Sequence, residues 1–309
     1  VPLLVLSMFL RGFRAARKSD VIHVHWPIAA LAGIMLKMIT GKKLVFTLYG
    51  ASVYVSKYKS LITWILKKVD HVIFISSYTR SKSFIRKNPE NESLITPGID
   101  YEKYKPLEID EITISDCFDR YGISRDSRKV MFLGRIIERK GVRYLIEAFG
   151  EVLKNSDDVE LLVAGKGPEV EELKALSQSL GIEQNILFLG AVPDEDIVWL
   201  YNASDVFVLP AIIDSTGDTE GLGMVLVEAM SCEKSVIASN VGGIVDVVDD
   251  GENGFLVPEK DTAQLADRIS RILNDREVSQ KMGKIGRQKV IDVFNWSNIA
   301  DRTEEIYRK

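Results

Sequence analysis

Short apolar runs alternate along the 309-residue chain with longer helix-forming segments. Runs rich in β-branched and aromatic residues begin at residues 20, 41, 71 and 93, and six more begin at residues 128, 159, 185, 205, 235 and 253. Each run is followed by glycine, proline or polar residues, so each predicts a buried strand. The segments between them predict helices at residues 28–39, 142–153, 197–203, 224–230, 262–273 and 297–308, after an amphipathic helix at residues 1–18. The alternation predicts an α/β protein with parallel sheets.

The length of the chain fits two domains. A proline-glycine turn at Pro97 and Gly98 closes the first set of strands, and the polar segment at residues 101–127 follows it. We expect a first domain at residues 1–107, a linker at 108–127, a second domain at 128–292 and a terminal segment at 293–309. Because the chain begins with Val and not Met, we also expect the first domain to be incomplete.

The charges are unevenly distributed. Residues 1–105 contain 17 Lys and Arg against 6 Asp and Glu, whereas the whole chain contains 40 against 44. Such a polarity suggests an anionic partner for the first half. Four cations at near-helical spacing follow the apolar run at residues 1–10, namely Arg11, Arg14, Arg17 and Lys18. They favour an anionic membrane surface over nucleic acid, for which no motif is present; the alternative is an ordinary solvated helix face.

The same apolar run is too short to span a bilayer. Cys117 and Cys232 have no metal-like spacing and indicate a reducing compartment without disulfides. We therefore expect a cytoplasmic protein, located peripherally at the inner face of the membrane.

A glycine-bearing loop lies between the strand that begins at residue 205 and the helix at 224–230. The loop directs backbone N–H groups to a helix N-terminus at the carboxyl end of a strand, where open α/β sheets bind ligands and the helix dipole favours anions. Glu220 lies in this loop, and Glu228 lies about two turns into the helix. From this loop alone the alternative stays open that Glu220 is a solvated loop charge and Glu228 an exposed helix residue.

Arg135 and Lys140 lie in the turn after the strand at residues 128–134. From the carboxyl end of a strand, these two residues can direct two cations at one ligand and neutralise negative charge that develops on it. A basic turn of this kind is most often only solvated. Arg139 is a third cation in the same turn.

The loop with the two glutamates resembles the Glu-x7-Glu signature of retaining glycosyltransferases with the GT-B fold, specifically glycosyltransferase family 4. The resemblance implies two facing Rossmann-like, doubly wound domains, the first incomplete here. It also implies that Glu228 binds the ribose of a nucleotide-diphosphate sugar. The donor sugar would be held by four consecutive residues, Glu220, Gly221, Leu222 and Gly223.

Further segments extend the resemblance over essentially the whole chain. Gly134, Arg135 and Lys140 stand as in the family's Gly-Arg-x4-Lys-Gly, whose cations contact the donor diphosphate; this spacing favours Lys140 over Arg139. By the same resemblance, the catalytic set is Arg135, Lys140 and Glu220. The nucleobase would stack after the strand at residues 185–192, next to Val192, and the terminal helix would cross back onto the first domain.

The first domain departs from the family pattern. Tyr49, followed by Gly50, stands where the family usually has His, and Ser52 stands where Asp is common. A tyrosine donates and accepts hydrogen bonds but stays uncharged near neutral pH. We expect Tyr49, Gly50 and His25 to contact the sugar or the acceptor. His23 and His25 alternate on one side of a strand, but the sequence places no third metal ligand near them.

Two other motifs suggest different chemistry. Gly165 and Gly167 follow a strand as in a dinucleotide-binding fingerprint, but Val170 replaces the third glycine, which argues against an NAD enzyme. Residues 194–196 read Asp-Glu-Asp, like the metal motif of the GT-A glycosyltransferases. Because these acids open a helix, N-terminal capping explains them more simply. We expect no metal and no cofactor.

The sequence thus predicts transfer of a sugar, with retention of configuration, from a nucleotide-diphosphate sugar to a glycan or lipid-linked acceptor. Retention is implied by the resemblance. Two alternatives stay open. One is another sugar-nucleotide enzyme on the same fold, such as an epimerase or a phosphorylase. The other is a non-catalytic subunit that binds a sugar nucleotide, which the departures at Tyr49 and Ser52 favour.

Overall fold

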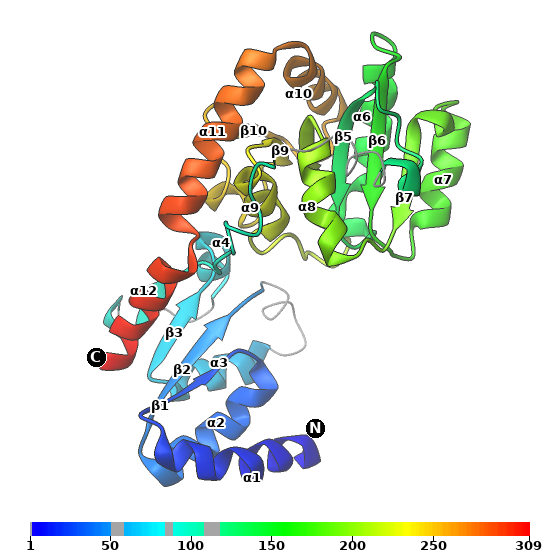
Figure 1. Cartoon of the computed structure of the whole chain (residues 1–309). Helices are drawn as coiled ribbons and strands as arrows, with labels where there is room; N and C mark the ends of the chain where they lie inside the picture. The colour runs from blue at the N-terminus through cyan, green and yellow to red at the C-terminus, as the bar shows by residue number, and fades with distance from the viewer. Residues whose placement is uncertain (1, 51–58, 84–88, 108–117) are drawn as a thin grey trace.

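A computed structural model describes residues 2–50, 59–83, 89–107 and 118–309. It contains two parallel sheets, one of four strands and one of six (Figure 1). Two of the residues discussed above, Ser52 and Cys117, lie outside the described residues. In the part of the chain that the structure describes, no helix has both the length and the apolar character needed to cross a bilayer.

The first sheet has the order β1 (Val21–Val24), β2 (Lys43–Leu48), β3 (His71–Phe74) and β4 (Glu92–Leu94), and all its pairs are parallel. Alternate strand residues face opposite sides. Leu44, Phe46 and Phe74 pack against the helices α1 (Pro2–Lys18), α2 (Pro27–Thr40) and α3 (Lys59–Lys68). Val45 and Ile73 face the other way and pack against the terminal helix α12 (Trp296–Arg308).

The second sheet has the order β10-β9-β8-β5-β6-β7. Its strands are β5 (Arg128–Leu133), β6 (Val159–Ala164), β7 (Ile186–Gly190), β8 (Val206–Leu209), β9 (Ser235–Ser239) and β10 (Gly254–Val257). The chain moves outward from β5 to β7, then returns to the other side of β5 with β8. The order reverses between β5 and β8, and this switch point is where an open α/β sheet leaves a crevice at the carboxyl ends of its strands.

Helices connect the strands of the second sheet and cover its faces. They are α6 (Val142–Leu153), α7 (Val170–Ser179), α8 (Asp194–Ala203), α9 (Met224–Ser231), α10 (Thr262–Asn274) and α11 (Arg276–Val293), with short 3-10 turns at Glu138–Lys140, Glu183–Asn185 and Ile244–Asp246. Apart from Arg128 and Lys129 at the start of β5, the strands β5 and β8 are apolar and mostly buried, as expected for a parallel sheet with helices on both faces. The short helix α4 (Ser77–Ser81), which belongs to the first sheet, lies near the junction with the second (Figure 1).

The expected fold, two Rossmann-like domains each built on a parallel sheet, is confirmed. All ten predicted strands are present, and each begins within two residues of its predicted start. The long helix α11 is not among the predicted helices. Its apolar residues are sparse and include two buried glycines, Gly283 and Gly286, so its sequence lacks a clear apolar stripe. The division of the chain at residues 107, 128 and 293 stays a prediction.

The chain returns to the first sheet after α11 (Figure 1). Phe294 is fully buried, and the Ile99 amide donates to the Phe294 carbonyl at 2.8 Å. Farther along α12, Arg302 donates to the Leu94 carbonyl at 2.6 Å, and Lys43 donates to the carbonyl of Ile306. These contacts fix α12 on the face of the first sheet opposite to α1, α2 and α3.

Candidate functional site

Two loops leave the second sheet side by side at its switch point. One runs from Gly134 to Gly141 after β5, and the other runs from Pro210 to Gly223 after β8. Gly141 has a φ of +66°, and a Cβ atom there would lie 1.9 Å from the Pro210 carbonyl oxygen. The Ile212 amide also donates to the Arg139 carbonyl at 2.9 Å. The two loops are therefore in backbone contact, and only glycine fits at position 141.

Charged side chains from both loops converge on Glu220. Lys140 forms an ion pair with the Glu220 carboxylate, and Arg139 Nη1 lies 3.5 Å from the same oxygen. Arg139 Nε lies 3.9 Å from Asp218. Burial alone would raise the pKa of Glu220, but Lys140 and Arg139 outweigh it and hold the pKa of this carboxyl below its ordinary value. Glu220 is therefore ionised at neutral pH, and it is not a solvated loop charge.

Arg135 is exposed in the turn after β5, and in the described structure it forms no ion pair. The backbone of its turn packs directly against the segment Gly165-Lys166-Gly167, which follows β6. A Cβ at Gly165 would lie 1.8 Å from the Gly134 carbonyl oxygen, and one at Gly167 would lie 1.8 Å from the Ile136 carbonyl oxygen. The two glycines that resemble a dinucleotide fingerprint thus allow close backbone packing beneath Arg135.

Glu228 lies in the second turn of α9, which begins after Gly223, a residue with φ +90°. The Tyr201 hydroxyl donates to the Glu228 carboxylate at 2.8 Å, and Tyr201 is fully buried. Burial raises the pKa of Glu228, although this hydrogen bond and the charge of Lys103 oppose the rise. Glu228 is half-buried, so the alternative of an exposed helix residue is wrong.

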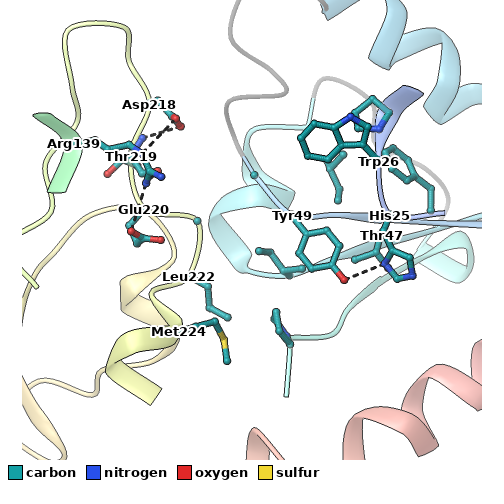
Figure 2. A pocket seen from close by; sticks show the side chains of 17 residues that line it. His25, Trp26, Thr47, Tyr49, Arg139, Asp218, Thr219, Glu220, Leu222 and Met224 are labelled. Atoms are coloured by element: carbon teal, nitrogen blue, oxygen red, sulfur yellow. Dashed lines mark hydrogen bonds and ion pairs between the residues drawn. The ribbon is translucent and has the colours of Figure 1, made fainter. Parts of the chain in front are cut away.

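The two sheets face each other across a cavity of about 340 Å³. Arg139, Glu220 and Gly221 line it from the second domain, and His25 and Tyr49 line it from the first (Figure 2). Gly50, Leu222 and Met224 also line it. At Gly221 a Cβ would lie 3.0 Å from the Tyr49 carbonyl oxygen, so the loop with Glu220 touches the first domain directly.

On the first-domain side of the cavity, the polar side chains are uncharged at neutral pH and lie among apolar ones such as Trp26 and Ile75. His25 and Tyr49 share a hydrogen bond of 3.0 Å, and burial lowers the pKa of His25 and raises that of Tyr49. The neighbouring His23 does not line this cavity; its ring contacts the hydroxyls of Thr47 at 2.8 Å and Tyr307 at 2.5 Å. Burial and the neighbouring His25 lower the pKa of His23 to about 4. At neutral pH His25 and Tyr49 can exchange hydrogen bonds with a ligand without placing charge on it.

The described residues contain no group of three His, Cys, Asp or Glu that could hold a metal ion. The capping interpretation of residues 194–196 is wrong in detail. Pro193 stands at the N-cap of α8, and the side chains form no capping hydrogen bond there. Asp196 instead accepts from Arg120 at 2.7 Å and from the Tyr121 hydroxyl at 2.6 Å, so it fastens the segment that precedes β5.

The sequence-predicted residues are therefore brought together only in part. Lys140, Glu220, Gly221 and Leu222 gather at the switch point. Val192 follows β7, packs against the main core and does not line the cavity. Sequence reasoning set Arg139 aside because of spacing, and it missed Asp218 and Tyr201. Arg139 and Asp218 adjoin predicted residues, but nothing in the sequence indicates that Tyr201 lies next to Glu228.

Profiles of two protein families match this chain. The family described as glycosyl transferases group 1 matches residues 115–289, and the family described as glycosyltransferase family 4 matches residues 2–103.

Among similar proteins, the GDP-mannose-dependent alpha-(1-6)-phosphatidylinositol monomannoside mannosyltransferase of Mycobacterium tuberculosis is 29% identical over 81% of this chain, which spans 64% of that protein's length. The N-acetyl-alpha-D-glucosaminyl L-malate synthase of Bacillus anthracis is 28% identical over 93% of this chain and 74% of its own length. The sucrose-phosphate synthase structure from Thermosynechococcus elongatus superposes with a TM-score of 0.81 at 26% identity, covering 99% of this chain and 77% of that one.

Proposed function

The chain belongs to the glycosyl transferases group 1 family, and on this basis we propose that it transfers a sugar from a nucleotide-diphosphate sugar to an acceptor. One observation carries the proposal. At the switch point of the second sheet, the buried Glu220 is paired with Lys140 and faces the neutral His25 and Tyr49 across the cavity. A carboxylate and neutral donors can hold sugar hydroxyls, while cations beside them can meet a diphosphate.

Each residue has a part in this proposal. Glu220 and the backbone of Gly221, Leu222 and Gly223 hold the donor sugar, and Glu228 accepts from the ribose hydroxyls. Lys140 and Arg135 stabilise the charge that develops on the departing nucleotide diphosphate. Arg139, which contacts both Glu220 and Asp218, is added to this set. Two loops that are fixed against each other position these groups before substrate arrives.

The finer features of the reaction belong to the same proposal. Transfer proceeds with retention of configuration, and Lys140 and Arg135 supply positive charge without a metal ion. The donor sugar contacts Tyr49, Gly50 and His25 on the first domain, and the nucleobase lies next to Val192. The acceptor is a glycan or a lipid-linked glycan at the inner face of the membrane, in the cytoplasm. The similar mannosyltransferase is named for a phosphatidylinositol mannoside, which supports a lipid-linked acceptor.

A second candidate function is a non-catalytic subunit that binds a sugar nucleotide. The observation that favours it is Tyr49, an exposed side chain whose hydroxyl is bonded to His25 and cannot carry charge near neutral pH. The two functions differ in turnover and not in binding, since both retain Lys140, Glu220 and Glu228.

The test has two stages. Thermal shifts with UDP, GDP and ADP sugars identify the donor. Lys140→Ala should reduce the shift, while Lys154→Ala, at an exposed lysine that follows the C-terminal end of α6, should leave it unchanged. Release of nucleotide is then measured with the chosen donor and two acceptors, a phosphatidylinositol mannoside and malate. Acceptor-dependent release supports transfer. Binding without release under either condition supports the binding subunit, and no shift with any sugar nucleotide contradicts both.

A further inference from the structure

The segment that leaves the first sheet is bonded to the second domain, with the Tyr104 carbonyl accepting from Ser231 and Arg287. Up to Gly98, in the part of the chain that holds the first sheet, direct polar contacts with the second domain are few. Among the described residues, the hydrogen bonds that join residues 2–98 to residues 128–293 are those between Ser77 and Asp246. The Ser77 amide donates to Asp246 Oδ2 at 2.5 Å, and the Ser77 hydroxyl donates to Asp246 Oδ1 at 2.6 Å. Both oxygens of one carboxylate are thus used by one residue of the opposite domain.

Ser77 is suited to this contact by its position at the start of α4. Ser76 caps the helix, because its side chain accepts from the Thr79 amide and its own amide donates to the Thr79 hydroxyl. The Ser77 amide is one of the first-turn N–H groups that have no partner inside a helix. Asp246 supplies that partner from the second domain, with a negative charge at the positive end of the helix.

Asp246 also ends the turn that supports Glu220. The Asp246 amide donates to the Gly243 carbonyl at 3.1 Å, and the Gly243 amide donates to the Glu220 carbonyl at 3.0 Å. A Cβ at Gly243 would lie 2.0 Å from the Gly221 carbonyl oxygen and 2.9 Å from Ser76 Cβ. The turn is therefore tightly packed between the loop that contains Glu220 on one side and the N-terminus of α4 on the other.

We propose that Asp246 is a positioning residue that holds the two domains closed through Ser77 and keeps the Glu220 loop against the first domain. The contact lies outside the cavity and none of its atoms lines it. Its loss would open the cleft while the loops at the switch point, which are fixed by contacts within the second domain, keep their arrangement. Loss of the Asp246 carboxylate should therefore lower the population of the closed arrangement and leave the affinity for the nucleotide unchanged. Of the measurements that test this inference, only the measurement of turnover rests on the proposed function.

Two variants break the contact from opposite sides. Asp246→Ala removes the acceptor. Ser77→Pro removes both donors, and proline fits the first position of a helix. The residue before it, Ser76, already has φ −154° and ψ 159°, the extended conformation that a following proline requires. Glu252→Gln is the control, because Glu252 is an exposed acid of the second domain six residues along the chain from Asp246.

Three measurements are made on each variant: the radius of gyration in solution by X-ray scattering, the Kd of the nucleoside diphosphate by calorimetry, and kcat for nucleotide release. Both variants should have a larger radius than wild type, a Kd within about twofold, and a kcat reduced by about tenfold, or about 1.4 kcal/mol at the transition state. Combining Asp246→Ala with Ser77→Pro should add little, because one interaction is lost in each case.

The scattering result stands on its own if no donor gives turnover, so a failure of the proposed function would not hide a failure of this inference. An unchanged radius in both variants would overturn it. So would a Kd that weakens as much as kcat falls, because Asp246 would then support the nucleotide site alone. Additive losses in the double variant would show that the two residues act separately, which also contradicts the proposal.

Discussion

Lys140 is a cation already engaged before any ligand binds. Its side chain is about 10% exposed and is paired with Glu220, whose side chain is 13% exposed. Breaking a mostly buried pair by removing one partner leaves the other charge uncompensated. Arg135 differs, because it is exposed and contributes no such pairing. The sequence motif gives Arg135 and Lys140 the same expected role, but the structure places Arg135 in solvent and Lys140 in a mostly buried ion pair.

Alanine at either cation should weaken binding of the nucleoside diphosphate by about 1.5–3 kcal/mol, the range for hydrogen bonds to charged groups. Only Lys140→Ala should also lower the free energy of unfolding at neutral pH, because it leaves the ionised Glu220 with Arg139 as its remaining cation. Calorimetry and urea unfolding measure the two effects, with Lys154→Ala as the control. Unchanged affinity in both variants would contradict the assignment of the diphosphate site.

At the scale of elements, β1, β2 and α12 meet at His23. Its two ring nitrogens contact Tyr307 of α12 and Thr47 of β2, so one side chain connects the edge of the first sheet to the terminal helix. The pKa of His23 is lowered from 6.5 to about 4 by burial and by His25. The contact is therefore made by a neutral imidazole.

This shift predicts a pH window. Between pH 6.5 and about 4 the unfolded chain binds a proton that the folded His23 does not, so the contribution of this group to stability is full above pH 6.5 and falls as the pH is lowered through the window. His23→Gln, which keeps a polar side chain of similar reach, should lose less stability from pH 7.5 to pH 4.5 than wild type. Urea unfolding at both pH values measures the difference. Equal losses in the two proteins would argue against a neutral, buried His23.

At the scale of the whole molecule, the helices α1, α2 and α3 cover the face of the first sheet opposite to α12, and α1 lies at the end of the molecule farthest from the second sheet (Figure 1). None of the three contains an acidic residue. The first half of α1 exposes apolar side chains, with Leu3 at 83% and Leu10 at 62%. Arg14 and Arg17 follow in the exposed part of its second half. Among the described residues neither arginine forms an ion pair, and exposed leucines next to such cations suit an anionic bilayer.

The protein should therefore bind vesicles of anionic lipid at low salt and dissociate near about 0.5 M salt, where screening is strong. Replacing Arg14 and Arg17 by Glu should abolish co-sedimentation, whereas Lys154→Glu with Lys174→Glu, the same charge change on the second domain, should not. Equal binding to neutral and anionic vesicles would be inconsistent with this surface.

The sequence by itself determined the parts whose physical cause is local. Apolar strands, helix-forming segments and glycine turns follow one another along the chain, and this order is enough to indicate two parallel sheets. The same local order placed Lys140 and Glu220 after strands, and therefore at one edge of a sheet. Helix α11 was not predicted because it does not pack through an apolar stripe. It packs closely through Gly283, where a Cβ would lie 2.0 Å from the Glu233 carbonyl oxygen.

Only the tertiary structure decided which charges meet. The reversal of strand order between β5 and β8 brings residues 140 and 220 into contact, and it brings Arg139 with them. Tyr201 reaches Glu228, and Ser77 reaches Asp246, from positions 27 and 169 residues away. No local pattern encodes such pairs, because each partner is an ordinary polar residue in its own segment. The pairs arise when strand order, helix packing and the return of α12 bring distant segments together.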